Sequence, residues 1–157
     1  MMLTTKGRYA VMALVDMADQ NRFIEEGGRA ISLAEIAKRQ DITVPYLEQI
    51  FSKLKHAGIV KSQRGPGGGY SFARNVNDIK ISEIISAAEE KIKMTRCGAE
   101  HSHCATGGKC STHDLWDGLS ETIENYFESI TLADLVNKKV RSSGVNRLST
   151  QPLTANH

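Results

Sequence analysis

Long apolar runs, aromatic residues and paired cysteines are all scarce in this sequence. The longest nearly apolar run, Tyr9 to Val15, is too short to cross a bilayer, and the first residues lack the apolar stretch of a signal peptide. Aromatic residues make up 6% of the 157 residues, and three cysteines cannot form a closed disulfide framework. We therefore expect a cytoplasmic protein with reduced thiols, and neither a membrane protein nor a disulfide-rich secreted one.

The apolar content is sufficient for a core. At 40% hydrophobic residues, the chain can fold as one domain, or as a small domain with an appendage, without disulfides. The net charge of +2 hides a division, because residues 1–75 carry 11 Lys+Arg and 7 Asp+Glu, whereas residues 76–135 carry 5 and 11. A basic first half suggests that only this half meets a polyanion. Ordinary solvated surface is the alternative.

Residues 32–58 have the pattern of two helices joined by a tight turn. Ser32 and Glu35 form a capping-box pattern at the start of the first helix, and Gln40-Asp41-Ile42 interrupts it. Thr43 is expected to cap the second helix, with Pro45 in its first turn, and Gly58 is expected to end it. The apolar stripe of this second helix consists of Leu47, Ile50, Phe51 and Leu54.

A β-hairpin is predicted directly after these two helices. Residues 59–62 and 70–72 read as short strands, and the segment Arg64-Gly65-Pro66-Gly67-Gly68-Gly69 reads as the turn between them. A nucleotide-binding loop fits poorly, because no Gly-Lys-Ser/Thr follows and Tyr70 stands where a dinucleotide fingerprint needs glycine. The expected fold is mainly α with a small β-hairpin wing, a winged helix–turn–helix followed by a long helix.

This order of elements indicates DNA binding. The second helix of such a motif enters the major groove with its N-terminal residues first, and a glycine-rich wing tip lets backbone and an arginine approach the phosphates. The alternative is a helix pair that only packs a core. The candidate DNA contacts are Thr43, Tyr46, Glu48 and Gln49 on the helix, and Arg64, Gly65, Gly67 and Gly68 on the wing.

The remaining elements flank this motif. A first helix is expected from Thr4 or Thr5 to about Ala18, and residues 79–81 read as a brief strand before a helix capped by Ser82. A long helix is predicted over residues 114–129, followed by another helix start at Thr131. The apolar residues of the long helix over residues 114–129 repeat at steps of three and four, which is typical of a helix that packs against another helix. This heptad-like seam includes Trp116, Leu119, Ile123 and Tyr126, and it is too short for a free-standing coiled coil.

Cysteine spacing indicates a metal site rather than a catalytic one. Cys97, Cys104, Cys110 and His113 fall within 17 residues, and three thiolates gathered without a cation are costly. Zinc and an iron–sulfur cluster both suit this donor set, although the wide gaps favour a larger group with several metal atoms. Cys110 and His113 could form a nucleophile–base pair, but no oxyanion-hole or substrate motif accompanies them. We therefore do not expect an enzyme.

Several motifs resemble those of the IscR-type regulators, the cluster-sensing members of a bacterial winged-helix family that also contains NsrR-type nitric-oxide sensors. The resemblance covers about residues 2–138. The motifs are Leu3-Thr4-Thr5-Lys6-Gly7-Arg8-Tyr9-Ala10, Tyr46-Leu47-Glu48-Gln49, Arg64-Gly65-Pro66-Gly67-Gly68-Gly69-Tyr70, and Cys110-x-x-His113 before Leu115-Trp116.

The resemblance implies a [2Fe–2S] cluster held by Cys97, Cys104, Cys110 and His113. It also implies a homodimer on a palindromic operator in double-stranded DNA, cluster delivery by the assembly machinery, and repression of cluster-assembly genes when loaded. Glu48 matches the family glutamate that discriminates between site classes, and Arg64 matches the wing arginine. Arg8 stands where the nitric-oxide sensors use an aspartate ligand.

The chain departs from the family pattern at two positions. The first cysteine gap has six residues where five are typical, and Pro45 replaces a usual serine. The expected organisation is a DNA-binding domain over residues 1–75, then a cluster loop (93–113) and dimerisation helix (114–129) within residues 76–138. Residues 139–157 are expected to form a disordered tail.

Overall fold

The computed structural model describes residues 5–21, 28–88 and 111–140. It confirms a mainly helical fold with one two-stranded antiparallel hairpin. None of the helices in these described ranges is long and apolar enough to span a membrane. The elements are α1 (Thr5–Gln20), α2 (Leu33–Gln40), α3 (Val44–His56), β1 (Val60–Gln63), β2 (Gly69–Phe72), η1 (Val76–Asp78), α4 (Ile81–Ala88), α5 (His113–Glu128) and α6 (Leu132–Val136).

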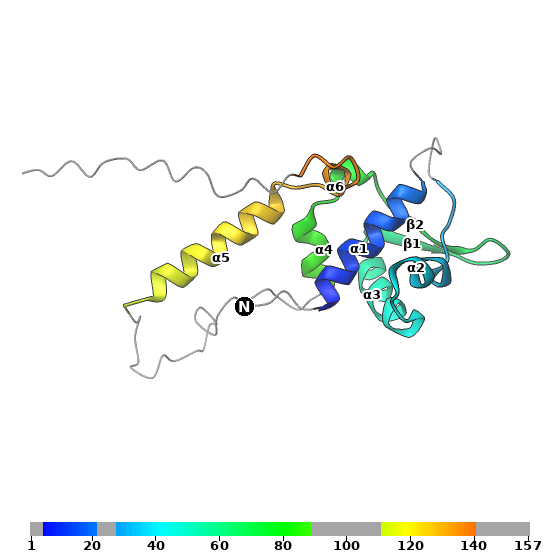
Figure 1. Ribbon diagram of the computed structural model, residues 1–157, viewed down its shortest axis with the longest axis horizontal. Coiled ribbons are helices and arrows are strands. Elements are labelled where there is room, and N and C mark those ends of the chain that lie inside the picture. Colours follow the sequence, from blue (N-terminus) through cyan, green and yellow to red (C-terminus); the bar gives the residue numbers. More distant parts are fainter. Residues whose placement is uncertain (1–4, 22–27, 89–110, 141–157) are drawn as a thin grey trace, which may run out of the picture.

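Helix α1 is the centre of the packing. It contacts α2, α3, α4 and α6, so segments from both halves of the sequence share one core. Figure 1 shows α5 projecting from this body on one side and the β1–β2 hairpin projecting on the other. The largest fully buried side chains include Leu14, Met17, Ile36, Phe51 and Ile84.

The predicted capping box at the start of α2 is present. The Ser32 hydroxyl accepts the Glu35 backbone N–H at 3.3 Å, and the Glu35 carboxylate accepts the Ser32 N–H at 2.9 Å. Arg29 adds an ion pair to the same carboxylate at 2.9 Å. These interactions favour the charged carboxylate and lower the pKa of Glu35 from 4.5 to about 2, with the Ser32 backbone N–H as the main cause.

The turn between α2 and α3 is formed by Asp41 in a left-handed conformation, with φ of 53°. Aspartate tolerates this conformation better than most non-glycine residues, which is why the chain can turn here without glycine. Thr43 occupies the N-cap of α3 as predicted, but its side chain makes no capping hydrogen bond. At the other end of α3, Gly58 has φ of 72° and the chain leaves the helix as expected.

The hairpin is joined to the helix–turn–helix by backbone hydrogen bonds. Val60 pairs with Phe72 and Gln63 with Gly69. Tyr70 also exchanges two backbone hydrogen bonds, of 2.9 and 2.8 Å, with Ile31 just before α2. A Cβ on Gly69 would lie 2.3 Å from the Ile31 carbonyl oxygen, so this close approach requires glycine.

The region after residue 75 differs from the sequence prediction in detail. Residues 79–81 form no strand, because only Lys80 makes an isolated bridge, to Thr131. Helix α4 begins at Ile81, so Ser82 lies inside its first turn and its hydroxyl donates to Glu128 at 2.5 Å instead of capping the helix. The helix start at Thr131 is confirmed by a second capping box. The predicted disordered tail, except for its first two residues, lies outside the described residues.

Candidate nucleic-acid interface

The outer face of α3 carries the predicted base-reading residues. Thr43, Glu48 and Gln49 are exposed, whereas the four residues of the apolar stripe are buried against the core. The burial of Leu47 and Ile50 orients Glu48 and Gln49 outward, since helical residues three or four apart share a face. This arrangement presents a carboxylate and a carboxamide, which are the groups that can accept from a cytosine amino group and read an adenine edge.

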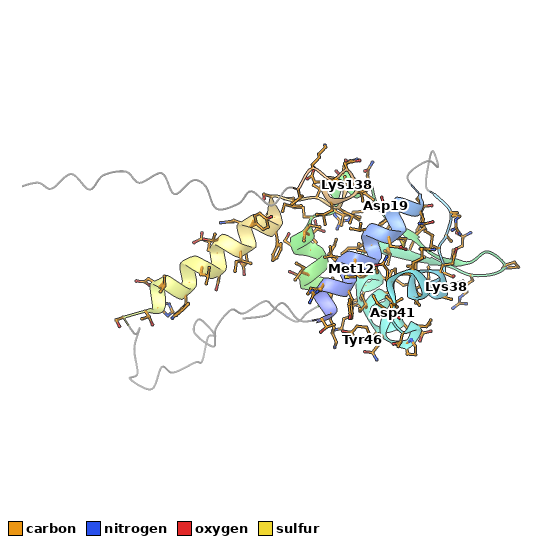
Figure 2. The ribbon with its side chains drawn as sticks, viewed as in Figure 1. Met12, Asp19, Lys38, Asp41, Tyr46 and Lys138 are labelled. Carbon is orange, nitrogen blue, oxygen red and sulfur yellow. The ribbon has the colours of Figure 1, made fainter. Side chains whose placement is uncertain are left out.

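Tyr46 has a structural contact that sequence reasoning did not predict. It is half-buried, and its ring meets the ring of Tyr9 edge-on, with centroids 5.8 Å apart. The contact ties the first turn of α3 to α1. Figure 2 labels Tyr46 at the edge of the body, near the Asp41 turn.

The wing tip is a tight turn over Gly65-Pro66-Gly67-Gly68. The Gly68 N–H donates to the Gly65 carbonyl at 2.9 Å, and Gly67 has φ of 72°. Proline second and glycine third with positive φ is the type II pattern. A Cβ on Gly68 would lie 2.5 Å from the Gln63 carbonyl oxygen. The tip therefore excludes large side chains, which leaves its backbone free to approach a phosphate.

Cationic side chains extend the interface beyond the predicted residues. Arg64 is exposed before the tip, and Lys61 is exposed on β1. The last turn of α3 adds the exposed side chains of Lys55 and His56. Lys61 and Lys55 were not among the predicted contacts, although Lys61 directly follows the apolar Val60, and successive strand residues face opposite sides.

A buried ion pair fixes α2 against α1. Arg39 donates to Asp16 from Nε at 2.9 Å and from Nη2 at 2.7 Å, and Gln40 donates at 3.0 Å. The Asp16 side chain is 6% exposed, and its carboxylate raises the pKa of the Arg39 guanidinium. Sequence reasoning missed this pair, although an acidic residue on the apolar face of a helix was the signal for it.

The predicted metal ligands are not brought together in the part of the chain that the structure describes. Cys97, Cys104 and Cys110 lie outside it, and His113 is the half-buried first residue of α5. Elsewhere in the described ranges, no group of three or more His, Cys, Asp or Glu side chains could hold a metal ion. The ligand set therefore stays a prediction.

Helix α5 has no buried residues. Trp116 and Tyr126 are 38% and 54% exposed, and Leu119 and Ile123 are half-buried. Only the C-terminal end of the segment enters the body, where Phe127 and Ile130 pack against the core. The predicted seam is thus left largely uncovered by the described residues of this chain.

A helix–turn–helix with an outward polar face, followed by a glycine-tipped basic wing, defines a winged-helix DNA-binding transcription regulator. The comparisons with known proteins agree. The Rrf2 model, described as an iron-dependent transcriptional regulator, matches residues 3–138. The chain belongs to the Rrf2 family.

Several curated relatives have the name HTH-type transcriptional regulator IscR, among them the following two. The protein of Pectobacterium atrosepticum is 47% identical over 139 residues, which cover 88% of this chain and 81% of that protein. The protein of Cereibacter sphaeroides is 44% identical over 143 residues, which cover 90% of each. The resemblance to IscR-type regulators is therefore confirmed, and the relatives are regulators rather than enzymes.

Solved structures show the same architecture. T. potens IscR is 35% identical with a TM-score of 0.70, and the match covers 94% of both chains. CymR of B. subtilis, described as the global cysteine regulator, is 30% identical with a TM-score of 0.71, covering 88% of this chain and 98% of that one.

Proposed function

We propose that this DNA-binding regulator senses iron–sulfur cluster supply through a [2Fe–2S] cluster and represses cluster-assembly genes when loaded. The observation that carries the proposal is the donor set Cys97, Cys104, Cys110 and His113, in a chain 47% identical to a protein named IscR. Thiolates suit iron–sulfur clusters, and imidazole suits iron, so the donor set fits the group.

The histidine ligand explains why such a site could act as a sensor. Replacing one thiolate by imidazole makes the site less negative, and histidine ligation raises the reduction potential in other clusters. His113 also stands at the start of α5, so a ligand at this position is joined directly to the proposed dimerisation helix. Loading of the site would then affect the ends of α4 and α5.

The proposed assembly is a homodimer that places two winged helices on a palindromic operator. The uncovered apolar seam on α5 supports pairing with a second copy. On each half-site, Thr43, Tyr46, Glu48 and Gln49 would meet the major groove. Arg64 and the glycines 65, 67 and 68 would meet the backbone beside the wing.

Anaerobic purification followed by visible spectroscopy and assays of iron and acid-labile sulfide tests the cofactor. We expect a coloured protein with two irons and two sulfides per chain, the stoichiometry of a [2Fe–2S] cluster. Cys110→Ala should abolish the colour and leave the unfolding temperature of the winged helix unchanged. A colourless protein with stoichiometric zinc would support the second candidate, a structural zinc site, which the close Cys110/His113 spacing favours.

A further inference from the structure

Helix α4 connects the cysteine-bearing segment to the recognition helix. Ala88, the last residue of α4, directly precedes residues 89–110, which contain all three cysteines. Helix α4 also packs against α3 and α1. Figure 1 shows α4 between the projecting α5 and the helix–turn–helix. Helix α4 therefore offers a route from the cysteine segment to α3.

The contact between the two helices includes a specific polar group. Lys53, in the last turn of α3, donates from Nζ to the backbone carbonyl of Ala88 at 3.4 Å. A backbone carbonyl has two lone pairs, so the Ala88 carbonyl can accept a hydrogen bond from a side chain of another helix. Lys53 thus ties the last described turn of α4 to the recognition helix.

The end of α4 is rigidly packed around this contact. Ile84, Ile85 and Ala88 are all buried, with exposed fractions of 2% or less. A buried helix end cannot shift without displacing its neighbours, since protein interiors are close-packed. Movement at Ala88 would therefore be transmitted to α3 rather than absorbed locally.

We infer that Lys53 is a positioning residue that couples the cysteine segment to the recognition helix through the Ala88 carbonyl. This inference rests on the proposed cluster-sensing function and names the route by which that function reaches DNA. Lys53 acts on the DNA contacts indirectly, by fixing the end of α4 against α3.

Three variants of the full chain separate this role from a simple loss of charge. Lys53→Met removes the donor and keeps the apolar stem, and Lys53→Arg keeps a long cationic donor. Lys55→Met is the matched control, because Lys55 is an exposed lysine in the same helical turn. Each methionine variant removes one positive charge from the DNA-binding half, so effects from phosphate attraction are matched.

The first measurement is amide hydrogen exchange of the DNA-free protein, which needs no bound cluster. We expect faster exchange over residues 84–88 in Lys53→Met, with Lys53→Arg and Lys55→Met close to the parent protein. Equal rates of amide exchange over residues 84–88 in all four proteins would show that the Lys53 contact does not stabilise α4, and this result does not depend on what the protein binds.

The second measurement is the affinity of the cluster-loaded and cluster-free forms for a duplex that the parent protein selects from a randomised library. We expect the ratio of the two affinities to move toward one by about threefold or more in Lys53→Met, as for residues that carry coupling between sites. Lys55→Met should lower both affinities and keep their ratio. An unchanged ratio in Lys53→Met would overturn the coupling role.

The two proposals fail in different ways. A parent protein that takes up no iron and sulfide, or whose affinity is the same with and without the cluster, contradicts the proposed function. Hydrogen exchange at α4 then still decides whether Lys53 holds the end of that helix.

Discussion

At the residue scale, the candidate interface consists of a few exposed side chains and of wing-tip glycines. Because these glycines have no side chain, the backbone can approach DNA. Glu48 is an exposed carboxylate on the face of α3 that meets DNA in this fold class. A carboxylate near phosphates is repelled, so it improves binding only where a donor such as a cytosine amino group faces it. We interpret Glu48 as a group that rejects wrong sites as much as it selects right ones.

Glu48→Ala is expected to broaden the set of sites bound by the cluster-free protein. Removing the repulsion should raise the affinity for non-preferred duplexes by about tenfold, the size of one good base contact. Competition binding with a panel of selected duplexes measures this change. Ser52→Ala, an exposed position one turn further along α3, is the control. An unaltered site preference in Glu48→Ala would remove the assigned role.

Glu35 provides a residue-scale test of the α2 cap. Its folded pKa of about 2 lies below its ordinary value of 4.5, so its stabilising contribution is complete above about pH 4.5 and is lost as the pH falls toward 2. Glu35→Gln should lower the free energy of unfolding by about 1 kcal/mol at pH 7, typical of a lost capping interaction.

The difference in free energy of unfolding between Glu35→Gln and the parent protein should become smaller as the pH falls from 5 toward 2. Urea unfolding followed by circular dichroism at several pH values measures it. If this difference in free energy of unfolding stays constant over the range, the charged carboxylate is not the stabilising form.

At the scale of elements, the strongest local signals in the sequence are correct. Three local features each predict the position of a helix within one or two residues, because each depends on neighbours along the chain. They are the capping box at Ser32, the apolar stripe on α3, and Gly58. The strand expected at residues 79–81 is wrong because Ile81 already belongs to α4 and Lys80 forms only an isolated bridge, to the distant Thr131. The Asp16–Arg39 pair joins residues 23 positions apart and was missed because it depends on tertiary packing.

Some features of the candidate site could be predicted from the sequence, and others could not. The exposed residues of α3 lie on one face of the helix and could be predicted from periodicity, whereas the wing tip could be predicted from its run of glycines around Pro66. The packing of Tyr46 on Tyr9 could not, because it depends on how α1 crosses α3. The assignments of DNA contacts, metal ligands and dimer residues remain predictions.

The α1–α2 junction should depend on its ion pair. Asp16→Ala leaves Arg39, whose side chain is 30% exposed, without its carboxylate, and the loss of these charged hydrogen bonds should cost about 2 kcal/mol. Thermal and urea unfolding should show the loss, whereas Asp19→Ala, an exposed acidic residue on the same helix (Figure 2), should change stability by less than about 0.5 kcal/mol. Equal stabilities for the two variants would mean that the pair does not hold α2.

At the scale of the whole molecule, α5 is a helix whose apolar seam is largely exposed among the described residues, apart from its C-terminal end. A solitary helix of 16 residues is marginally stable in water, so its apolar seam needs a partner surface. The proposed homodimer supplies that surface and sets the distance between two recognition helices.

Ile123→Glu is expected to convert a dimer to a monomer. A carboxylate in the centre of the seam opposes its burial against a second copy. Light scattering after size-exclusion chromatography should give half the mass of the parent protein, and binding to a palindromic duplex should weaken. Glu121→Gln, an exposed position outside the seam, should remain dimeric. A monomeric parent protein would contradict the assembly itself.

The central place of α1 has a consequence for synthesis. Helix α1 is translated before α4 and α6, against which it packs and which end at residues 88 and 136. The core around α1 is therefore complete only after both helices have been translated. A nascent chain that has just completed its DNA-reading elements can pack α1 on α2 and α3 but still exposes the surface of α1 that α4 and α6 cover, and this core is completed only after the cysteines that are proposed to regulate the protein have emerged.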